Sequence, residues 1–353
     1  MGQTIEPTLG YSARNGTAVS STARINASDA GQGPAQTQIR KRRVSVIIPT
    51  RDRPDFLAEA MTSVRALEGP DLEFEILIGD NGSNPDTPKV AERFGARYFK
   101  VERQGAAAAR NAGMRAATGD YIAHLDDDDL WTADHVRPHL ALMEANPEIY
   151  TVVGRILCTD TERKPIGEAW PQSVPDHGDL FMTFMSYFPQ VGGTISRAAV
   201  RETVGLFDET LLGDADWDWQ LRIAKKHRIG FAPVTCVLFR QRPSGEADAV
   251  HLRRIPHTRR IFLRHALPEW RRWNSPTGLY RSYNKSMAPY FIYFVNTAHA
   301  RAERGDYRGA LAAIGHAVKL VPVRGLREFA RSSDLRGSLF RAVLGGRLSQ
   351  KTH

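Results

Sequence analysis

Residues 121–129 read YIAHLDDDD, so four consecutive aspartates follow a short, largely apolar segment. Four adjacent carboxylates repel one another, and a fold tolerates them where a cation neutralises the cluster. The apolar segment is typical of a buried strand, and open α/β sheets bind ligands beyond the carboxyl ends of their strands. Hard oxygen ligands in that position suit Mg²⁺ or Mn²⁺. A solvated acidic turn or the start of a helix is the structural alternative.

The segments around this run alternate between strand and helix patterns. Apolar, β-branched runs predict strands at 44–48, 74–79, 97–101, 121–125, 150–158 and 229–239. Apolar residues at helical spacing predict helices at 54–67, 87–94, 106–117, 181–188 and 217–227. The alternation predicts an α/β fold, in which a mostly parallel, Rossmann-like sheet is flanked by helices.

Composition limits the class of protein. The chain has 353 residues and 42% hydrophobic content, enough for one large domain or two modest ones. Two cysteines, Cys158 and Cys236, form no disulfide framework. No run approaches the length of a membrane span and no signal-peptide core is present, so we expect a cytoplasmic protein. Despite the net charge of +9 no nucleic-acid-binding motif occurs, and we expect no nucleic-acid partner.

Three regions follow one another along the chain. Residues 1–43 are rich in small polar residues and are expected to be a disordered leader. Residues 44–245 form the predicted α/β domain, and residues 246–353 are expected to be an all-helical appendage. Within the appendage, residues 298–322 resemble one tetratricopeptide helical hairpin, which we expect to pack on the α/β domain.

The end of the chain has the pattern of a basic amphipathic tail. Between residues 324 and 347 six arginines stand against two acids, and apolar residues recur at roughly helical spacing. Such a helix can bind an anionic membrane surface, which would place the protein at the inner face of the cytoplasmic membrane. The alternative is that the apolar side packs on the appendage, and the glycines of the tail favour this alternative.

Five motifs occur in a fixed order: VIIPTRDR at 46–53, IGDNGS at 78–83, ARNAG at 109–113, GDYI at 119–122 leading into LDDDD at 125–129, and DW at 216–217 with Arg222. Together, residues 44–242 resemble the family 2 glycosyltransferases of the GT-A fold. The resemblance implies an inverting hexosyltransferase that moves one sugar from a nucleoside-diphosphate sugar, usually UDP-linked, to a hydroxyl. The implied acceptor is a glycan or lipid-linked glycan in cell-envelope or surface glycan synthesis.

The resemblance implies a metal-dependent donor site. The family pattern Leu-Asp-any-Asp-Asp makes Asp128 the direct ligand of Mn²⁺ or Mg²⁺, and Asp126 a partner of the ribose or of a metal-bound water. We expect one or both of Asp127 and Asp129 to be solvated. Contacts to the nucleotide sugar are expected from Pro49, Thr50, Asp52, Asp80, Arg110, Asp126, Asp127 and Gly193.

The resemblance gives Asp80 and Arg110 defined roles, and each residue also has a simpler structural interpretation. Asp80 would accept the imino N–H of uracil, or it would bond the backbone of its own turn. Arg110 would neutralise the diphosphate, or it would pair with a surface carboxylate.

Asp216 aligns with the general base of the family, because Arg222 then falls at the arginine position of the family. An acceptor hydroxyl must lose its proton as it attacks, so one base and one metal on opposite sides of the anomeric carbon suffice for single displacement with inversion. Asp214 and Asp218 are alternative bases, and a helix N-cap is the structural alternative for Asp216.

Four further residues are ambiguous. Asn81 and Ala215 stand where the family often has Asp and Glu, and Ala215 leaves in doubt the acceptor contact that the Glu would make. Trp217 could stack on a sugar or belong to the core. His251 follows the last predicted strand, where some relatives supply a metal-binding histidine, and a structural role is the alternative.

Three other functions fit part of the pattern. A nucleotidyltransferase would share the α/β fold, but it needs a glycine-rich loop where this chain has PTRDR at 49–53. A catalytically inactive nucleotide-sugar-binding protein would have little reason to retain Asp126, Asp128 and Asp216, since buried unpaired carboxylates are costly. A scaffold acting through the helical tail would leave the metal site dispensable.

Overall fold

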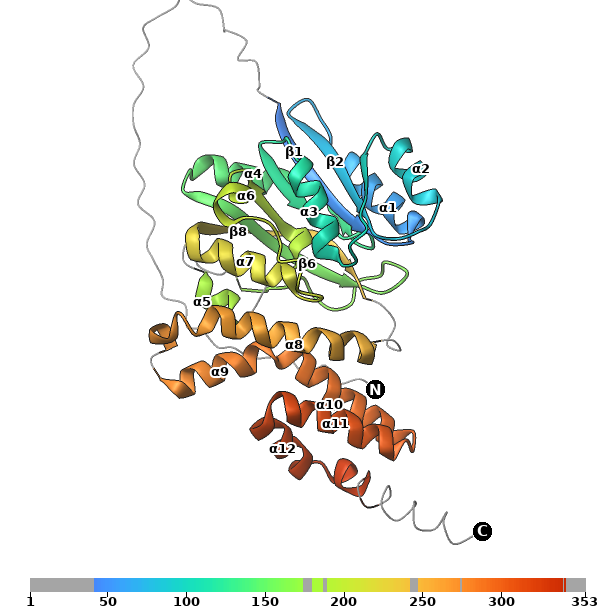
Figure 1. The fold of residues 1–353 in the computed structure, drawn as a ribbon, viewed down its shortest axis with the longest axis vertical. Helices are drawn as coiled ribbons and strands as arrows, with labels where there is room; N and C mark the ends of the chain where they lie inside the picture. Colours follow the sequence, from blue (N-terminus) through green and yellow to red (C-terminus); the bar gives the residue numbers. More distant parts are fainter. Residues whose placement is uncertain are drawn as a thin grey trace, which may run out of the picture. The chain divides into compact units, whose positions relative to one another are not determined.

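The computed structural model describes residues 41–173, 180–186, 189–241, 247–273, 275–338 and 340. They form an eight-stranded sheet with helices on both faces, followed by a helical C-terminal region (Figure 1). Most of the predicted leader, residues 1–40, lies outside the described residues. Its predicted end at 43 needs a correction, because the first strand already begins at Arg42.

The strands pair in the order β3-β2-β1-β4-β7-β6-β8-β5. The parallel half contains β1 (Arg42–Thr50), β2 (Leu72–Asp80), β3 (Arg97–Lys100) and β4 (Tyr121–His124). The mixed half contains β5 (Leu130–Trp131), β6 (Ile149–Thr159), β7 (Thr194–Arg197) and β8 (Arg228–Arg240). Since β7 runs antiparallel to both β4 and β6, it joins the two halves into one sheet. The predicted fold class is confirmed.

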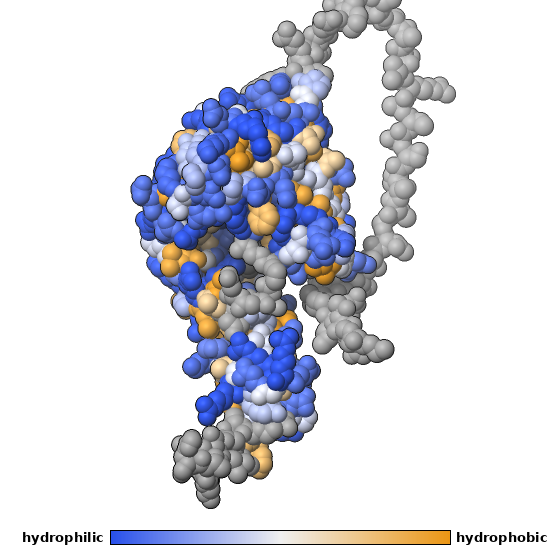
Figure 2. All heavy atoms as spheres, turned by 90° about the vertical axis from the view of Figure 1, so that its right-hand side faces the viewer, coloured by the Kyte–Doolittle hydropathy of each residue, from blue (hydrophilic) through white to orange (hydrophobic). Residues whose placement is uncertain are grey.

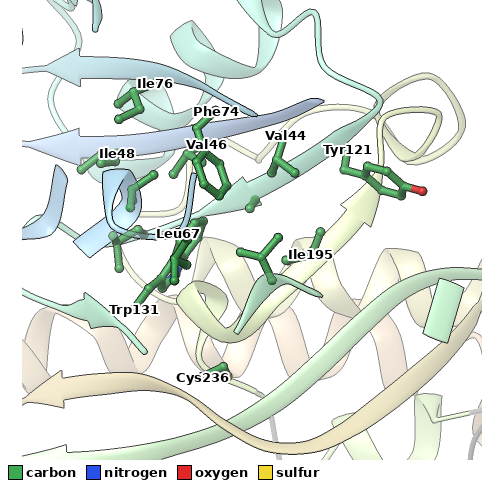
Figure 3. Close-up of a cluster of buried hydrophobic side chains, with 14 of the residues drawn as sticks. Val44, Val46, Ile48, Leu67, Phe74, Ile76, Tyr121, Trp131, Ile195 and Cys236 are labelled. Atoms are coloured by element: carbon green, nitrogen blue, oxygen red, sulfur yellow. The ribbon is translucent and has the colours of Figure 1, made fainter. Parts of the chain in front are cut away.

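Helices cover both faces because buried strands alternate their side chains. In β1, Val46 and Ile48 enter one hydrophobic cluster, which packs against α1 (Pro54–Arg65), α2 (Asp86–Arg93) and α4 (Val136–Ala145) (Figure 3). Ile47 enters the second cluster, on the opposite face. That face is covered by α3 (Ala106–Ala116), α5 (Phe181–Phe184), α6 (Val200–Val204) and α7 (Ala215–Lys226).

Helix α4 was not predicted from the sequence. Its first turn contains Pro138, which weakened the helical pattern. Proline is tolerated at this point because the first turn has no intrahelical partner for its missing N–H. The short strands β5 and β7 and the helix α6 were not predicted either.

The C-terminal region is helical. It consists of α8 (Ala247–Ala266), the 3₁₀ turn η2 (Trp270–Trp273), α9 (Pro276–Ser286), α10 (Ala288–Glu303), α11 (Tyr307–Leu320) and α12 (Pro322–Arg331). Helix α8 packs against α7, and its Ile261 and Phe262 belong to the second cluster of the α/β domain (Figure 1). Helices α10 and α11 enclose a third cluster, and the predicted hairpin at 298–322 falls on the end of α10 and on α11. No helix among the described residues has the length and hydropathy to cross a membrane.

One buried carboxylate ties α7 to α8. Asp218 is completely buried, and it accepts hydrogen bonds from Arg222 Nε at 2.9 Å, Arg264 Nη1 at 2.9 Å and His265 Nε2 at 3.0 Å. Burial alone would raise its pKa, but the hydrogen bond from His265 and the charges of Arg222 and Arg264 lower the pKa below its ordinary value. The cluster therefore stabilises the fold in the ionised state of Asp218.

We predict that Asp218→Ala lowers the free energy of unfolding by about 3–5 kcal/mol at neutral pH, because it removes the completely buried carboxylate that the partly buried Arg222 and Arg264 share. Since the folded-state pKa is lowered, this contribution is present above the unfolded pKa and is lost as the pH falls through the folded pKa. Urea unfolding at about pH 7 and about pH 3 measures both effects. Glu162→Ala, which removes an exposed ion pair with Lys164, is the control. Equal losses from the two variants would contradict the prediction.

Candidate active site

A cavity of about 400 Å³ opens at the carboxyl edge of the parallel strands. Its walls come from the end of β1, the aspartate run after β4, the start of α3, residues 211–216 and the start of α8. The charged residues among those described around it balance in number: Arg51, Arg53, Arg110, Arg253 and Arg254 face Asp126, Asp127, Asp128, Asp214 and Asp216. The cavity therefore carries both cationic groups for an anionic ligand and carboxylates for a cation or a proton.

The aspartate run folds into a tight turn, in which the N–H of Asp129 donates to the carbonyl of Asp126 at 3.1 Å. The prediction that Asp127 or Asp129 is solvated is wrong, because both are only 1% exposed. Asp129 accepts hydrogen bonds from Gln190 Nε2 at 2.9 Å and from the backbone N–H of Arg240 at 3.0 Å. Burial, together with the charge of Asp126, raises the pKa of Asp129 well above its ordinary value.

Asp127 fixes the run to the end of β1. It accepts hydrogen bonds from Thr50 Oγ1 at 2.7 Å and from Arg53 Nη2 at 2.5 Å. Arg53 also donates to Asp128 Oδ2 at 2.8 Å, so one guanidinium bridges two carboxylates of the run. Burial raises the pKa of Asp127 to about 6, against the opposing effect of Arg53. Arg53 was not predicted as a site residue, although its position three residues after Thr50, in the first motif, indicated that it lies near the site.

Arg110 approaches the run from the opposite wall. Its Nη2 lies 2.5 Å from Asp126 Oδ1, and its side chain is buried next to the ring of Phe207. The alternative of a surface ion pair is therefore wrong for Arg110. Asp126 stays partly exposed to the cavity, with 30% of its side-chain surface accessible.

Asp216 lies in the first turn of α7 and lines the same cavity as Asp126. Its Oδ1 accepts a hydrogen bond from the backbone N–H of Trp217 at 3.1 Å. The N-cap position of α7 belongs to Asp214, so the N-cap alternative for Asp216 is wrong. Burial raises the pKa of Asp216, although the charge of Arg110 acts in the opposite direction. A carboxylate with a raised pKa on the wall of a cavity can accept a proton.

The two alternative bases are engaged in structural contacts. Asp214 accepts hydrogen bonds from Arg254 Nε at 3.0 Å and Tyr290 OH at 2.6 Å, and from the hydroxyl of Thr258. Asp218 belongs to the buried α7–α8 cluster described above. Asp214 and Asp216 both line the cavity, but Asp214 is almost completely buried and held by three side chains, whereas Asp216 is partly exposed and can meet a ligand.

Two rim residues position loops and do not line the cavity. Asp52 has a φ of 56°, and its Oδ1 accepts the backbone N–H groups of Ser83 at 2.5 Å and Asn84 at 2.8 Å. Asp80 accepts the N–H of Gly82 at 2.7 Å and the hydroxyl of Tyr98 at 2.8 Å, which is the turn arrangement given above as the alternative. Pro49 and Thr50 do line the cavity, as predicted from the first motif.

Three further predicted residues lie elsewhere. Trp217 is 1% exposed and donates its Nε1–H to the carbonyl of Phe184 at 2.7 Å, so it is a core residue and cannot stack on a sugar. Gly193 is buried, and an added Cβ there would lie 3.0 Å from Cys236 Sγ. The ring of His251 packs 4.3 Å from that of Tyr293, and the histidine is not among the residues that line the cavity.

Helix α8 supplies site residues that the sequence did not reveal. Arg253 and Arg254 line the cavity, although both belong to the region expected to be an appendage. Arg254 pairs with the buried Asp214, and the charge of Asp214 raises the pKa of its guanidinium against the effect of burial. No motif marks these arginines, because the contact joins residues 40 positions apart.

Comparisons with known proteins agree with this geometry. Residues 45–194 match the model of glycosyl transferase family 2. Over these residues the chain is similar to the family 2 glycosyl transferases. An uncharacterized glycosyltransferase of Rickettsia felis is 34% identical over 215 residues, which make up 58% of this chain and 34% of that protein. The uncharacterized glycosyltransferase YwdF of Bacillus subtilis is 26% identical over 234 residues, 64% of this chain and 85% of YwdF.

Solved structures show the same fold. The crystal structure of S. aureus TarS 1-349 in complex with UDP-GlcNAc has a TM-score of 0.56 and 15% sequence identity, and the match covers 86% of this chain and 92% of that chain. The match therefore includes helices that follow residues 45–194. The chain spans only about a third of the length of the Rickettsia relative.

We predict that Asp127→Asn stabilises the α/β domain near neutral pH by up to about 3 kcal/mol, because it removes a charge that burial disfavours. The folded-state pKa lies above the unfolded value, so wild-type stability falls as the pH rises from about 4 to above 6. The advantage of the variant should grow across that window. Urea unfolding at about pH 4 and about pH 7 measures it, with the exposed Asp134→Asn as control. A variant less stable than wild type at both pH values would oppose this account.

Proposed function

We propose that the protein is a glycosyltransferase that binds a nucleoside-diphosphate sugar in this cavity and transfers the sugar to an acceptor hydroxyl. The observation that carries the proposal is the placement of Asp216 and the aspartate run on one cavity at the carboxyl edge of the sheet, with Arg110 between their charges. Members of the matched family and the UDP-GlcNAc complex of TarS support a nucleotide-sugar donor.

The cationic side of the cavity would hold the donor diphosphate. Arg53 and Arg110 are already fixed by carboxylates, so their guanidinium groups are oriented before a ligand arrives. Arg51 and Arg253 add positive charge at the rim. The nucleoside would lie across Pro49 and Thr50. A UDP-linked donor is the proposed choice. Asp80 is 1% exposed, does not line the cavity and already accepts hydrogen bonds on both oxygens, so the uracil imino N–H would need another acceptor.

The carboxylates of Asp126 and Asp128 fit a divalent cation such as Mn²⁺ or Mg²⁺. Both line the cavity and offer hard oxygen ligands, which these ions prefer and usually combine with waters and phosphate oxygens. Burial is the main cause of the raised pKa of Asp127 beside them, and the negative charges of Asp128 and Asp126 add to it, so a cation would offset that repulsion. When bound, the cation would neutralise charge on the departing diphosphate. Asp127 and Asp129 hold the turn that presents the two ligands.

Asp216 would be the general base. Its raised pKa brings proton uptake closer to the working pH, and its place on the cavity wall lets it reach an acceptor hydroxyl. The hydroxyl oxygen would bond to the anomeric carbon as the bond to the diphosphate oxygen breaks, and Asp216 would take the hydroxyl proton. A single displacement of this kind inverts the anomeric centre. No second nucleophile is required.

Asp216→Asn keeps the size and hydrogen bonding of the side chain but cannot accept a proton. We expect it to bind the donor normally and to lose at least about 10²-fold in kcat. The assay follows released nucleotide from a panel of nucleotide sugars with Mn²⁺ and a lipid-linked or glycan acceptor, with Asp134→Asn as the exposed control. Anomeric NMR of the product should show inversion. A full rate in Asp216→Asn, or product of the configuration of the donor, would overturn the mechanism.

Asp128→Ala tests the metal proposal separately. We expect turnover to be abolished and Mn²⁺-dependent donor binding to weaken, while the melting temperature stays unchanged or rises, because a crowded carboxylate has been removed. Donor binding is measured by calorimetry with and without Mn²⁺. Full wild-type activity in EDTA would contradict metal dependence.

We infer a second feature of this function, contact with an anionic membrane surface where a lipid-linked acceptor would lie. Helix α12 exposes Val323 and Leu326, each with 58% of its surface accessible, beside the exposed Arg327 and Arg331. The rest of the visible surface in Figure 2 is mostly hydrophilic with scattered apolar residues. Against this, Phe329 packs on the third cluster, so only one side of the helix is available. Residues 341–353 of the predicted tail lie outside the described residues.

Co-sedimentation with anionic and neutral liposomes at low salt tests this contact. We expect Arg327→Gln/Arg331→Gln to weaken binding to anionic liposomes roughly 30-fold, since each arginine near the surface contributes about 1 kcal/mol. The control is Lys89→Gln/Arg93→Gln, which removes the same charge from the exposed side of α2. Equal binding by both variants, or no binding by the wild type, would refute the contact.

A further inference from the structure

A cluster of metal-ligand residues lies on the other side of the sheet from α7. His135, His139 and Cys236 are all completely buried, and one ligand atom of each lies within 4.8 Å of the others. His135 precedes α4 and His139 lies in it, four residues apart, so both rings face the same side. Cys236 reaches them from β8. None of these residues lines the proposed catalytic cavity.

His135 lacks the hydrogen bonds that buried rings normally have. Within the described part of the chain, neither ring nitrogen of His135 has a hydrogen-bond partner. Its surroundings are the rings of Trp131, with centroids 4.5 Å apart, and of His139, with centroids 4.6 Å apart. Buried polar atoms without partners are costly, and each one in a folded protein requires an explanation, such as an ion.

His139 contacts a backbone carbonyl through one of its ring nitrogens. Its Nε2 lies 3.3 Å from the carbonyl oxygen of Gly193, which fixes one side of the ring. The same carbonyl lies 3.9 Å from Cys236 Sγ, so this nitrogen is on the side of the ring that faces the thiol. Gly154 leaves space beside the cluster, since a Cβ at this position would lie 2.6 Å from Cys236 Sγ and 3.1 Å from His139 Nε2. A larger residue there would occupy the space between the thiol and the ring.

We propose that His135, His139 and Cys236 bind a zinc-like divalent metal ion, separate from the Mn²⁺ or Mg²⁺ of the catalytic cavity. Two imidazoles and a thiolate are borderline-to-soft ligands that select Zn²⁺ or Co²⁺ over Mg²⁺ and Mn²⁺. Zinc bonds of about 2.0–2.3 Å place ligand atoms roughly 3.5 Å apart, so the side chains need to move by about an ångström. A water or a backbone carbonyl would complete a four-coordinate site.

Binding changes the state of Cys236. The thiol loses its proton to solvent and forms the metal–sulfur bond as a thiolate, so one proton is released for each ion bound. The hydrogen bond that Cys236 Sγ now donates to the carbonyl of Arg155 at 2.8 Å is lost in the same step. Both cysteines are free, and no disulfide competes for this sulfur. The imidazole nitrogens bind as neutral ligands.

The test uses untagged, full-length protein, freed of metal with a chelator under reducing conditions and titrated with Co²⁺. We expect one equivalent to bind at this site, with the intense charge-transfer absorption of a thiolate–Co²⁺ bond and the d–d bands of four-coordinate Co²⁺. Cys236→Ser should lose the charge-transfer band, whereas Cys158→Ser, which changes the other cysteine, should keep it. Excess Mg²⁺ should leave the bands unchanged, and Zn²⁺ should displace Co²⁺ and bleach them.

A second measurement separates this site from the catalytic one. Asp128→Ala removes a proposed ligand of the catalytic cation, and it should retain the Co²⁺ spectrum in full. Zn²⁺ should raise the Tm of the wild type and of Cys158→Ser by several degrees, and should not raise the Tm of Cys236→Ser. If Cys236→Ser does not fold, the wild-type titration still decides. A folded wild type that gives no thiolate–Co²⁺ band, or a Cys236→Ser variant with an undiminished band, overturns the proposal and leaves the cluster as core packing.

Discussion

The site depends on how the fold compensates four adjacent carboxylates. Two of them, Asp127 and Asp129, are turned into the protein, where hydrogen bonds from β1, from the residue that precedes the η1 turn (Val191–Gly193) and from β8 take the place of water. Arg53 and Arg110 then hold the two that face the cavity. The contacts that offset the repulsion within the run therefore come from segments that are far apart in the sequence. The chain can keep a high density of negative charge at one point because the partners of that charge are rigid.

This arrangement favours function at the expense of stability. Burial raises the pKa of Asp127 and Asp129, which means that their ionised forms are disfavoured by the fold. Sites that concentrate like charge are typical of proteins that bind a cation or an anion of high charge, since the ligand supplies the missing compensation. By contrast, Asp218 has a lowered pKa and three hydrogen-bond donors around it, two of them arginines, so it strengthens the fold. Ionised Asp127 and Asp129 therefore destabilise the fold, whereas ionised Asp218, in the same domain, stabilises it.

The sequence predicted the strands of the α/β domain because their apolar runs are long and unbroken, as in β1. It predicted less well where the signal is short or contains a breaker, as in β7 and in α4 with Pro138. Motif order placed Asp216, Asp126 and Arg110 around one cavity. It could not show that Trp217 belongs to the core, because an aromatic residue in an amphipathic helix has the same local pattern in either position. Only the tertiary contacts of such an aromatic residue distinguish a core position from a sugar-binding one.

The pair formed by Asp214 and Arg254 has an evolutionary consequence. It joins the loop before α7 to the first helix of the C-terminal region, and Asp214 adopts a left-handed backbone with φ of 56° to make the contact. Exchange of helical regions between related transferases would separate the two partners and leave a buried charge uncompensated. We therefore expect the residues at positions 214 and 254 to covary among relatives. Where helical regions are exchanged, the exchanged segment should begin after α8 and not before it. The wall of the cavity and its first supporting helix would then evolve as one piece.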